Sequence, residues 1–119
     1  MDKYSAILQE LIKNAGIEGA ALVSSDGLPI ASALGAGFEE DRIAAMSAAI
    51  LSLGERVAEE LEKGTLEQIT IKGDTGYVIL TGIGQEAVLT VLADNNVKLG
   101  LLLMEIKRSQ ESLKKAMEL

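Results

Sequence analysis

The sequence contains no cysteine and no histidine, which removes many of the side chains that proteins use for chemistry. Without cysteine there is no disulfide framework and no thiolate nucleophile. Without histidine the chain lacks the commonest general base and the commonest metal ligand. We therefore expect no catalytic residue, no bound metal and no cofactor, and we do not expect an enzyme.

Basic residues are also in short supply: 11 lysines and arginines stand against 18 aspartates and glutamates, for a net charge of -7. No basic patch is visible along the chain, so nucleic acid and anionic membrane surfaces are not expected as partners. The longest apolar run, Leu99–Met104, is far too short to span a membrane, and the first four residues do not form a signal peptide. We expect a soluble, cytoplasmic protein.

Aromatic residues make up only 3% of the chain and hydrophobic residues 48%, so the core must be built from aliphatic side chains. A length of 119 residues fits a single domain, here residues 1–119, and no linker or repeat interrupts it. This is a large amount of apolar material for a small domain, so part of it is expected to face a partner.

Apolar periodicity and turn signals predict an α+β fold with the element order α-β-β-α-β-β-β-α. A first helix is expected at residues 2–16, with Asp2 as its cap and residues 14–16 as its end. A second is expected at residues 38–63, with Gly64 as its stop, and a third at residues 97–117. Strands are expected at residues 19–23, 28–34, 66–72, 77–81 and 87–92. Asp26-Gly27 closes the first hairpin. The last three strands are joined too closely for a parallel crossover, so they should form an antiparallel meander.

Three of the expected strands, at residues 19–23, 77–80 and 87–92, are apolar at nearly every position, so helices should cover both faces of the sheet. The other two strands have the features of sheet edges. Pro29 cannot donate to a ladder, and the strand at residues 66–72 alternates between apolar and polar positions. An open edge of this kind favours pairing with another chain.

The expected middle helix carries two stripes of uncharged residues, and no charged residue occurs between Ile43 and Leu53. The larger stripe is predicted to pack on the sheet and consists of Ile43, Met46, Ile50, Leu53, Val57 and Leu61. The smaller stripe consists of Ala45, Ala48, Ala49 and Ser52, extended by Ala44 and Leu51. A helix that is apolar around most of its circumference is usually buried around most of it.

Two interpretations of the smaller stripe remain open. Either the helix is alanine-rich and partly exposed, or its small residues allow the close approach of a helix from a second copy of the chain. We favour the second interpretation. It is a twofold dimer in which the middle helices pack together and the third strands meet edge to edge, through Gln68, Ile69, Thr70 and Ile71.

Three short patterns loosely resemble ligand-binding loops, and each fails on its context. Gly35-Ala36-Gly37 is not followed by the Lys-Ser/Thr pair of a phosphate loop. Gly82–Ala87 leads into a strand, whereas a dinucleotide fingerprint opens a helix. Asp94–Glu105 places Lys98 and Leu99 where a calcium loop needs oxygen ligands. We expect neither a nucleotide nor calcium to bind.

Three segments, taken in order, resemble the roadblock (dynein light chain) family. Ala21–Ser32 resembles the first hairpin of that family, Gly73–Leu80 a segment of its second half, and Asp94–Leu102 the start of its last helix. The resemblance covers essentially the whole chain. It implies a five-stranded antiparallel sheet with the long middle helix on one face and the two terminal helices on the other. It also implies dimers formed through the long helix and the third strand.

Members of the roadblock family are dynein subunits, scaffolds for Ras-like GTPases and regulators of bacterial gliding-type GTPases. In this last branch the dimer stimulates GTP hydrolysis by positioning the GTPase's own residues and supplies no catalytic residue. The resemblance therefore implies a homodimer that binds a small Ras-like GTPase, for which we propose Arg42, Leu51 and Glu55 as contacts. The alternative is a structural adaptor in a motor or scaffold assembly, indifferent to nucleotide. A small-molecule sensor is disfavoured because the chain offers few aromatic residues to line a pocket.

Overall fold

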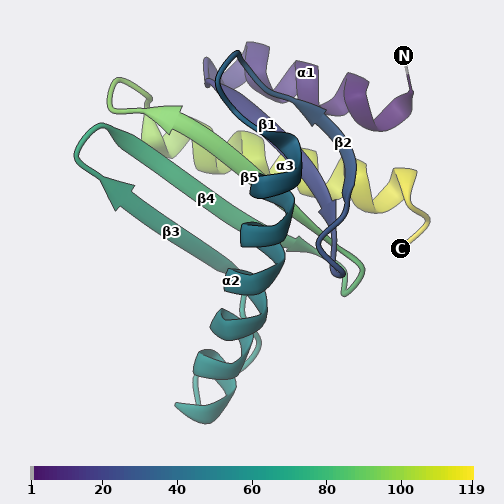
Figure 1. Cartoon of the computed structure of the whole chain (residues 1–119), viewed down its shortest axis with the longest axis vertical. Helices are drawn as coiled ribbons and strands as arrows, with labels where there is room; N and C mark the ends of the chain where they lie inside the picture. The colour runs from purple at the N-terminus through teal and green to yellow at the C-terminus, as the bar shows by residue number, and fades with distance from the viewer. Residues whose placement is uncertain (1) are drawn as a thin grey trace.

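The computed structural model describes residues 2–119, which form three helices and one five-stranded antiparallel sheet (Figure 1). In chain order the elements are α1 (Lys3–Ala15), β1 (Gly19–Ser24), β2 (Pro29–Ala33), α2 (Glu40–Glu60), β3 (Gln68–Gly73), β4 (Gly76–Ile83), β5 (Ala87–Asp94) and α3 (Leu99–Ala116). This confirms the α+β class and the order α-β-β-α-β-β-β-α.

The strands are arranged in the order β2-β1-β5-β4-β3, so β2 and β3 are the edges, as the sequence predicts. Strands β3, β4 and β5 form the expected antiparallel meander, and β1 pairs with β5 in the middle of the sheet. The proline at position 29 lies on an edge strand, where its missing N–H removes no central ladder bond.

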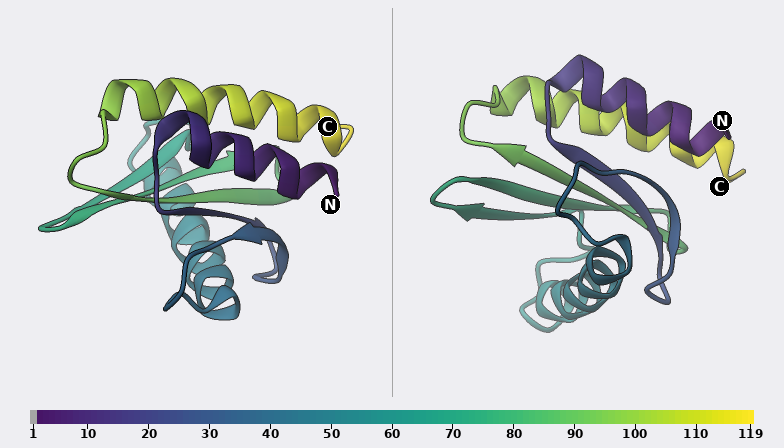
Figure 2. Two further views of the ribbon diagram at one scale, coloured as in Figure 1. Left: turned by 90° about the horizontal axis from the view of Figure 1, so that it is seen from above. Right: turned by 45° about the horizontal axis from the view of Figure 1, so that its top comes forward.

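The helices cover the sheet unequally: α1 and α3 lie side by side on one face and α2 lies alone on the other (Figure 2). The main core lies under α1 and α3, where Leu8, Leu22 and Leu102 are fully buried. A smaller cluster of Ala21, Val23 and Ala44 lies under α2. These layers are the ones that the family resemblance implies.

The ends of α1 are closed as the sequence predicts. The carboxylate Oδ1 of Asp2 accepts a hydrogen bond of 2.7 Å from the N–H of Ser5, which lowers the pKa of Asp2. At the other end Gly16 adopts a left-handed backbone with φ of 67°, and its N–H donates to the carbonyl of Ile12 at 2.9 Å. The chain then turns directly into β1.

Helix α2 ends at Glu60, three residues before the expected end at Lys63. Glu62 adopts a left-handed backbone with φ of 59°. The N–H groups of Lys63 and Glu62 then bond back to the carbonyls of Ala58 and Glu59, at 2.7 and 3.1 Å. This is the paired closure of a Schellman motif. The sequence pointed to Gly64 as the stop because glycine is the residue that most often adopts this conformation.

Small side chains hold α2 against the sheet. Ala44 and Ser47 are its two fully buried residues, and Ala44 packs on Ala21 and Val23 of β1. The hydroxyl of Thr90 on β5 donates a hydrogen bond of 2.7 Å to the hydroxyl of Ser47, and both residues are buried. Because these side chains are short, the helix backbone lies close to the strands, and this contact sets its position over the sheet.

Most of the large apolar stripe of α2 does not pack on the sheet, so that prediction is wrong except for Ile43, which packs against the cluster of Ala21, Val23 and Ala44. Met46 and Leu53 are each 58% exposed, Val57 is 48% exposed and Leu61 is 66% exposed. Only Ile43 and Ile50 are half-buried. The physical reason is that the small residues Ala44 and Ser47 face the strands, which turns the larger residues outward. Hydropathy alone does not assign the inner side of a helix with two apolar sides.

Replacing Thr90 by valine should destabilise the fold, because it removes the donor to Ser47 while keeping the side-chain shape. We expect a loss of about 1–3 kcal/mol in the free energy of unfolding, measured by urea denaturation at fixed protein concentration. The double variant Ser47→Ala/Thr90→Val should lose less than the sum of the two single variants. Thr75→Val in the exposed β3–β4 turn is the control, and strict additivity at the buried pair would contradict the prediction.

Candidate protein-interaction surface

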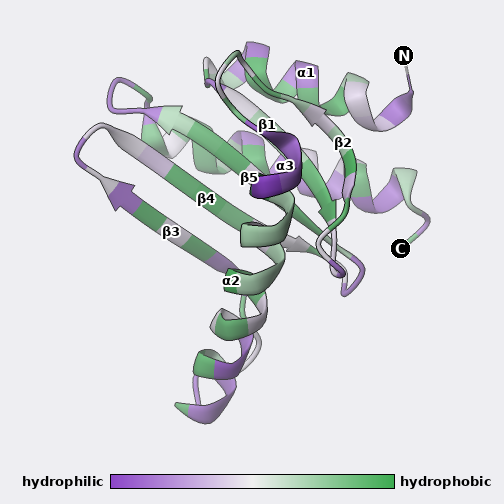
Figure 3. Ribbon diagram, viewed as in Figure 1, coloured by the Kyte–Doolittle hydropathy of each residue, from purple (hydrophilic) through white to green (hydrophobic). Residues whose placement is uncertain are grey.

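The most unusual surface of the molecule is the outward side of α2. We define the outer face of α2 as Met46, Ala49, Leu53 and Val57, all of which are exposed. Their spacing of three and four residues places them on one side of the helix. Exposed apolar groups gathered on one helix face are typical of a surface that contacts another protein. Figure 3 shows this side of α2 as a series of green, hydrophobic bands.

The outer face of α2 continues onto strand β3. A Cβ atom at Gly54 would lie only 2.7 Å from Cδ1 of Ile69, so this glycine lets α2 approach β3 closely. Between the two elements runs an open apolar groove of about 370 Å³, lined by residues that include Leu53, Val57 and Ile69. Ile71 follows on the same face of β3 and is 41% exposed. We call this combined region the α2–β3 surface.

The outer edge of β3 is open. Within residues 2–119, β3 pairs with β4 on one side and has no neighbouring strand on the other. Its backbone N–H and C=O groups along that edge are free to bond to a strand of another chain. The free edge and the apolar α2–β3 surface therefore adjoin each other, which favours a partner that engages both.

The structure distributes the predicted small stripe over two sides of α2. Ala49 lies on the outer face, and Ala45 and Ser52 are exposed beside it. Ala48 is half-buried and faces the chain's own β1–β2 turn, where a Cβ atom at Gly27 would lie 3.7 Å from Cβ of Ala48. A side chain larger than alanine at position 48 would therefore disturb this hairpin rather than a partner.

The four predicted residues of β3 also divide between two faces. Ile69 and Ile71 lie on the α2 side of the sheet, whereas Gln68 and Thr70 lie on the side of α1 and α3. The sequence alternation predicts this division, but not which face belongs to α2. Met46, Leu53 and Val57 were not predicted from the sequence as part of the interaction surface, because these large apolar residues were expected to pack on the sheet.

The three residues proposed as partner contacts do not form one patch. Arg42 and Glu55 are exposed but lie more than three helical turns apart, and Leu51 is half-buried on the inner side of α2. The guanidinium of Arg42 is 3.7 Å from the carboxylate of Glu39, with both side chains more than 70% exposed. An ion pair this exposed contributes little to stability, so Arg42 is available to a partner.

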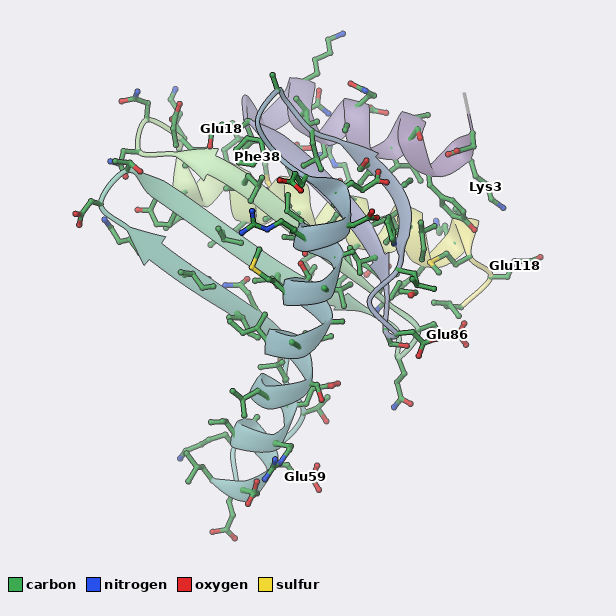
Figure 4. All side chains as sticks on the ribbon, in the orientation of Figure 1. Lys3, Glu18, Phe38, Glu59, Glu86 and Glu118 are labelled. Carbon is green, nitrogen blue, oxygen red and sulfur yellow. The ribbon has the colours of Figure 1, made fainter. Side chains whose placement is uncertain are left out.

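The far end of α2 projects beyond the sheet and is acidic. Figure 4 shows Glu59 at this end, and Glu60 beside it pairs with Arg56 at 3.3 Å. All these groups face solvent, which is the arrangement of a solvated helix end rather than an acid–base pair. Across residues 2–119, the acidic side chains form no group of three or more suited to holding a metal ion.

Residues 3–93 match the model of the Roadblock/LC7 domain, and the chain belongs to that family. Two uncharacterised proteins of Methanocaldococcus jannaschii, MJ1340 and MJ0310, are 41% and 40% identical to it over 108 residues, which cover 91% of this chain and 94% of each relative. Among solved structures, Myxococcus xanthus MglB is 25% identical, with a TM-score of 0.94 over 99% of this chain and 97% of that one.

A Roadblock/LC7 domain from Streptomyces avermitilis has the same fold, with a TM-score of 0.89 at 20% identity over 97% of this chain and 98% of that one. The resemblance that the sequence motifs predict is therefore confirmed. Members of the family are adaptors or regulators rather than enzymes. In the part of the chain described here, none of the helices is long and apolar enough to cross a membrane.

The role of Gly54 can be tested against a second helical glycine. Gly100 in α3 has open space around it, so Gly100→Ala should gain about 0.5–1 kcal/mol in the free energy of unfolding. Gly54→Ala should gain less or lose stability, because Ile69 and Leu66 must move to admit the methyl group. Urea denaturation of both variants checks this, and equal gains would contradict a tight α2–β3 approach.

Proposed function

We propose that the chain is a cytoplasmic, non-enzymatic homodimer that binds and regulates a small Ras-like GTPase. The observation that carries this proposal is the α2–β3 surface. An apolar helix side and an open strand edge lie next to each other in a protein of the Roadblock/LC7 family. Both features are unfavourable in an isolated chain, and one partner geometry covers them together.

The dimer has twofold symmetry, so the same surface is used on both chains. Antiparallel pairing of β3 with a second β3 joins the two sheets edge to edge and satisfies the free backbone groups. The same operation brings the two α2 helices together, and small Ala49 lies at the middle of the outer face, where it permits close approach. Met46, Leu53 and Val57 then leave water, at about 25 cal/mol per Å² of apolar surface buried.

We propose a GTPase as the partner because some members of the family, acting as dimers, regulate Ras-like GTPases of the bacterial gliding type. The composition supports regulation by positioning the GTPase's own residues, because the chain has no histidine or cysteine to offer. Its three arginines, Arg42, Arg56 and Arg108, each lie within 4 Å of a glutamate of the same helix. The pairs of Arg42 and Arg56 are exposed and contribute little to stability, so both arginines remain available to contact the GTPase.

Light scattering tests the dimer. The wild type should have twice the chain mass of 12.5 kDa at micromolar concentration. Ala49→Glu should be monomeric, because it places two carboxylates against each other in an apolar contact. Ala6→Glu adds the same charge at an exposed alanine of α1 and should remain dimeric. A monomeric wild type, or a dimeric Ala49→Glu variant, would contradict the proposed interface.

The GTPase partner is tested with purified small Ras-like GTPases encoded near this gene, loaded with GTP analogue or GDP. The wild type and Ala6→Glu should bind one of them preferentially in the GTP-like state and change its rate of GTP hydrolysis. Ala49→Glu should lose both effects, because the paired helices form the contact. Binding that is indifferent to nucleotide would indicate a structural adaptor instead, and absence of binding to every GTPase tested would contradict the proposal.

A further inference from the structure

The face of the sheet that carries α1 and α3 is only partly covered. Helix α1 packs on β1 and β2, and α3 packs on β4, so β3 lies beyond both helices. In both views of Figure 2 the β3–β4 hairpin extends past the two terminal helices. On this face β3 presents Gln68, Thr70 and Lys72, and all three are exposed. This is the face opposite to α2.

A groove runs between α3 and this uncovered strand. It has a volume of about 490 Å³, with Leu103, Lys107 and Lys114 of α3 along one side and Gln68 of β3 along the other. Its floor is ordered by Gln110, whose Nε2 donates to the carbonyl of Gly82 at 2.8 Å and to the hydroxyl of Thr81 at 3.3 Å. We call this groove, together with the exposed face of β3, the β3 slot.

The β3 slot of one chain is too narrow for a helix, whereas the slot of a dimer is wide enough for one. Neighbouring strands lie about 4.8 Å apart, and an α-helix with its side chains is about 10 Å across, so one helix covers about two strands. One chain leaves only β3 uncovered. In the proposed homodimer, on which this inference rests, two β3 strands adjoin and leave one slot two strands wide, bounded by α3 of each chain.

The charged side chains of the β3 slot indicate the charge of the partner that it would bind. Lys107 and Lys114 line the groove, and Lys72 lies on the same face of β3 with its Nζ 5.4 Å from the centre of the Tyr77 ring. Glu67 is the one acidic residue among those that line the groove in the described chain. The groove lining therefore carries two lysines against one glutamate, and Lys72 adds positive charge further along β3, on a chain whose net charge is -7. Its complement is acidic.

We propose that the β3 slot docks one acidic, amphipathic helix of a partner protein per dimer. The apolar side of that helix would contact Leu103, which is half-buried at the groove wall, and its carboxylates would meet the lysines of both chains. Because the slot lies on the dimer axis, one helix fills it and excludes a second. The face used is opposite to α2, so this partner and the GTPase bind at the same time.

The test uses a fluorescein-labelled helical peptide of 21 residues with leucines on one side and glutamates on its flanks. It is titrated into the wild-type protein by fluorescence anisotropy, and into ¹⁵N-labelled protein by NMR. We expect one peptide per two chains, with shifts of the amide resonances of Gln68, Thr70 and Lys107 and none at Met46 or Leu53. The same peptide with lysine in place of glutamate should bind at least about tenfold more weakly.

Charge-reversal variants locate the contact. Lys107→Glu/Lys114→Glu should weaken binding of the acidic peptide about tenfold or more, whereas Lys13→Glu/Lys115→Glu makes the same charge change on exposed lysines outside the groove and should have little effect. Equal losses in the two variants, no binding, or shifts confined to α2 would overturn the proposal. Equally tight binding of a single-stranded oligothymidine of the same charge would overturn it as well.

Light scattering on the same samples separates this proposal from the proposed function. A dimeric protein that does not bind the acidic peptide overturns the β3 slot and leaves the α2–β3 dimer standing. A monomeric wild type overturns the dimer and, with it, a slot that needs two β3 strands. Binding of one peptide per chain, rather than one per dimer, also overturns the slot as described here.

Discussion

The short contact of Ala44 and Ser47 with the sheet is the interaction on which the rest of this structure depends. With a buried alanine and a hydroxyl pair to Thr90 at 2.7 Å, α2 lies close to β1 and β5 and is locked in rotation about its own axis. That rotation turns Met46, Leu53 and Val57 outward. Larger side chains on the inner side would not fit in this close contact unless the helix moved away from the strands.

Strand β3 is the second element that determines the surfaces of the molecule, because its alternating side chains belong to two different faces of the sheet. Ile69 and Ile71 extend the apolar region of α2 on one face, and Gln68, Thr70 and Lys72 line a polar, basic slot on the other. The backbone edge between them is open. In the proposed assembly this single edge strand would join the dimer contact, the GTPase platform and the site for a further partner, and pairing of two such strands would complete all three.

Most of the fold could be predicted from local sequence patterns. The element order, both edge strands, the cap at Asp2 and the stop at Gly16 followed from periodicity, turn residues and capping chemistry. The side of α2 that faces the sheet could not be predicted in this way, because hydropathy does not distinguish which of two apolar stripes on one helix is buried. The contact of Ala48 could not be predicted either, because it is made with the turn at Gly27, a segment that precedes α2 in the chain. The end of α2 was also placed late, because a glutamate adopts the left-handed conformation that glycine usually takes.

By itself the sequence determined the α+β class, the order of strands and helices, the family, and the absence of cysteine and histidine chemistry. These depend on residue type and on neighbours within a few positions. Only the tertiary structure decided which side of α2 is exposed and which lysines gather beside β3. Lys107 and Lys114 share one side of α3, but no local pattern shows that they lie across a groove from Gln68, which is far from them along the chain. Packing of segments distant in sequence sets both surfaces, and that information exists only in the folded molecule.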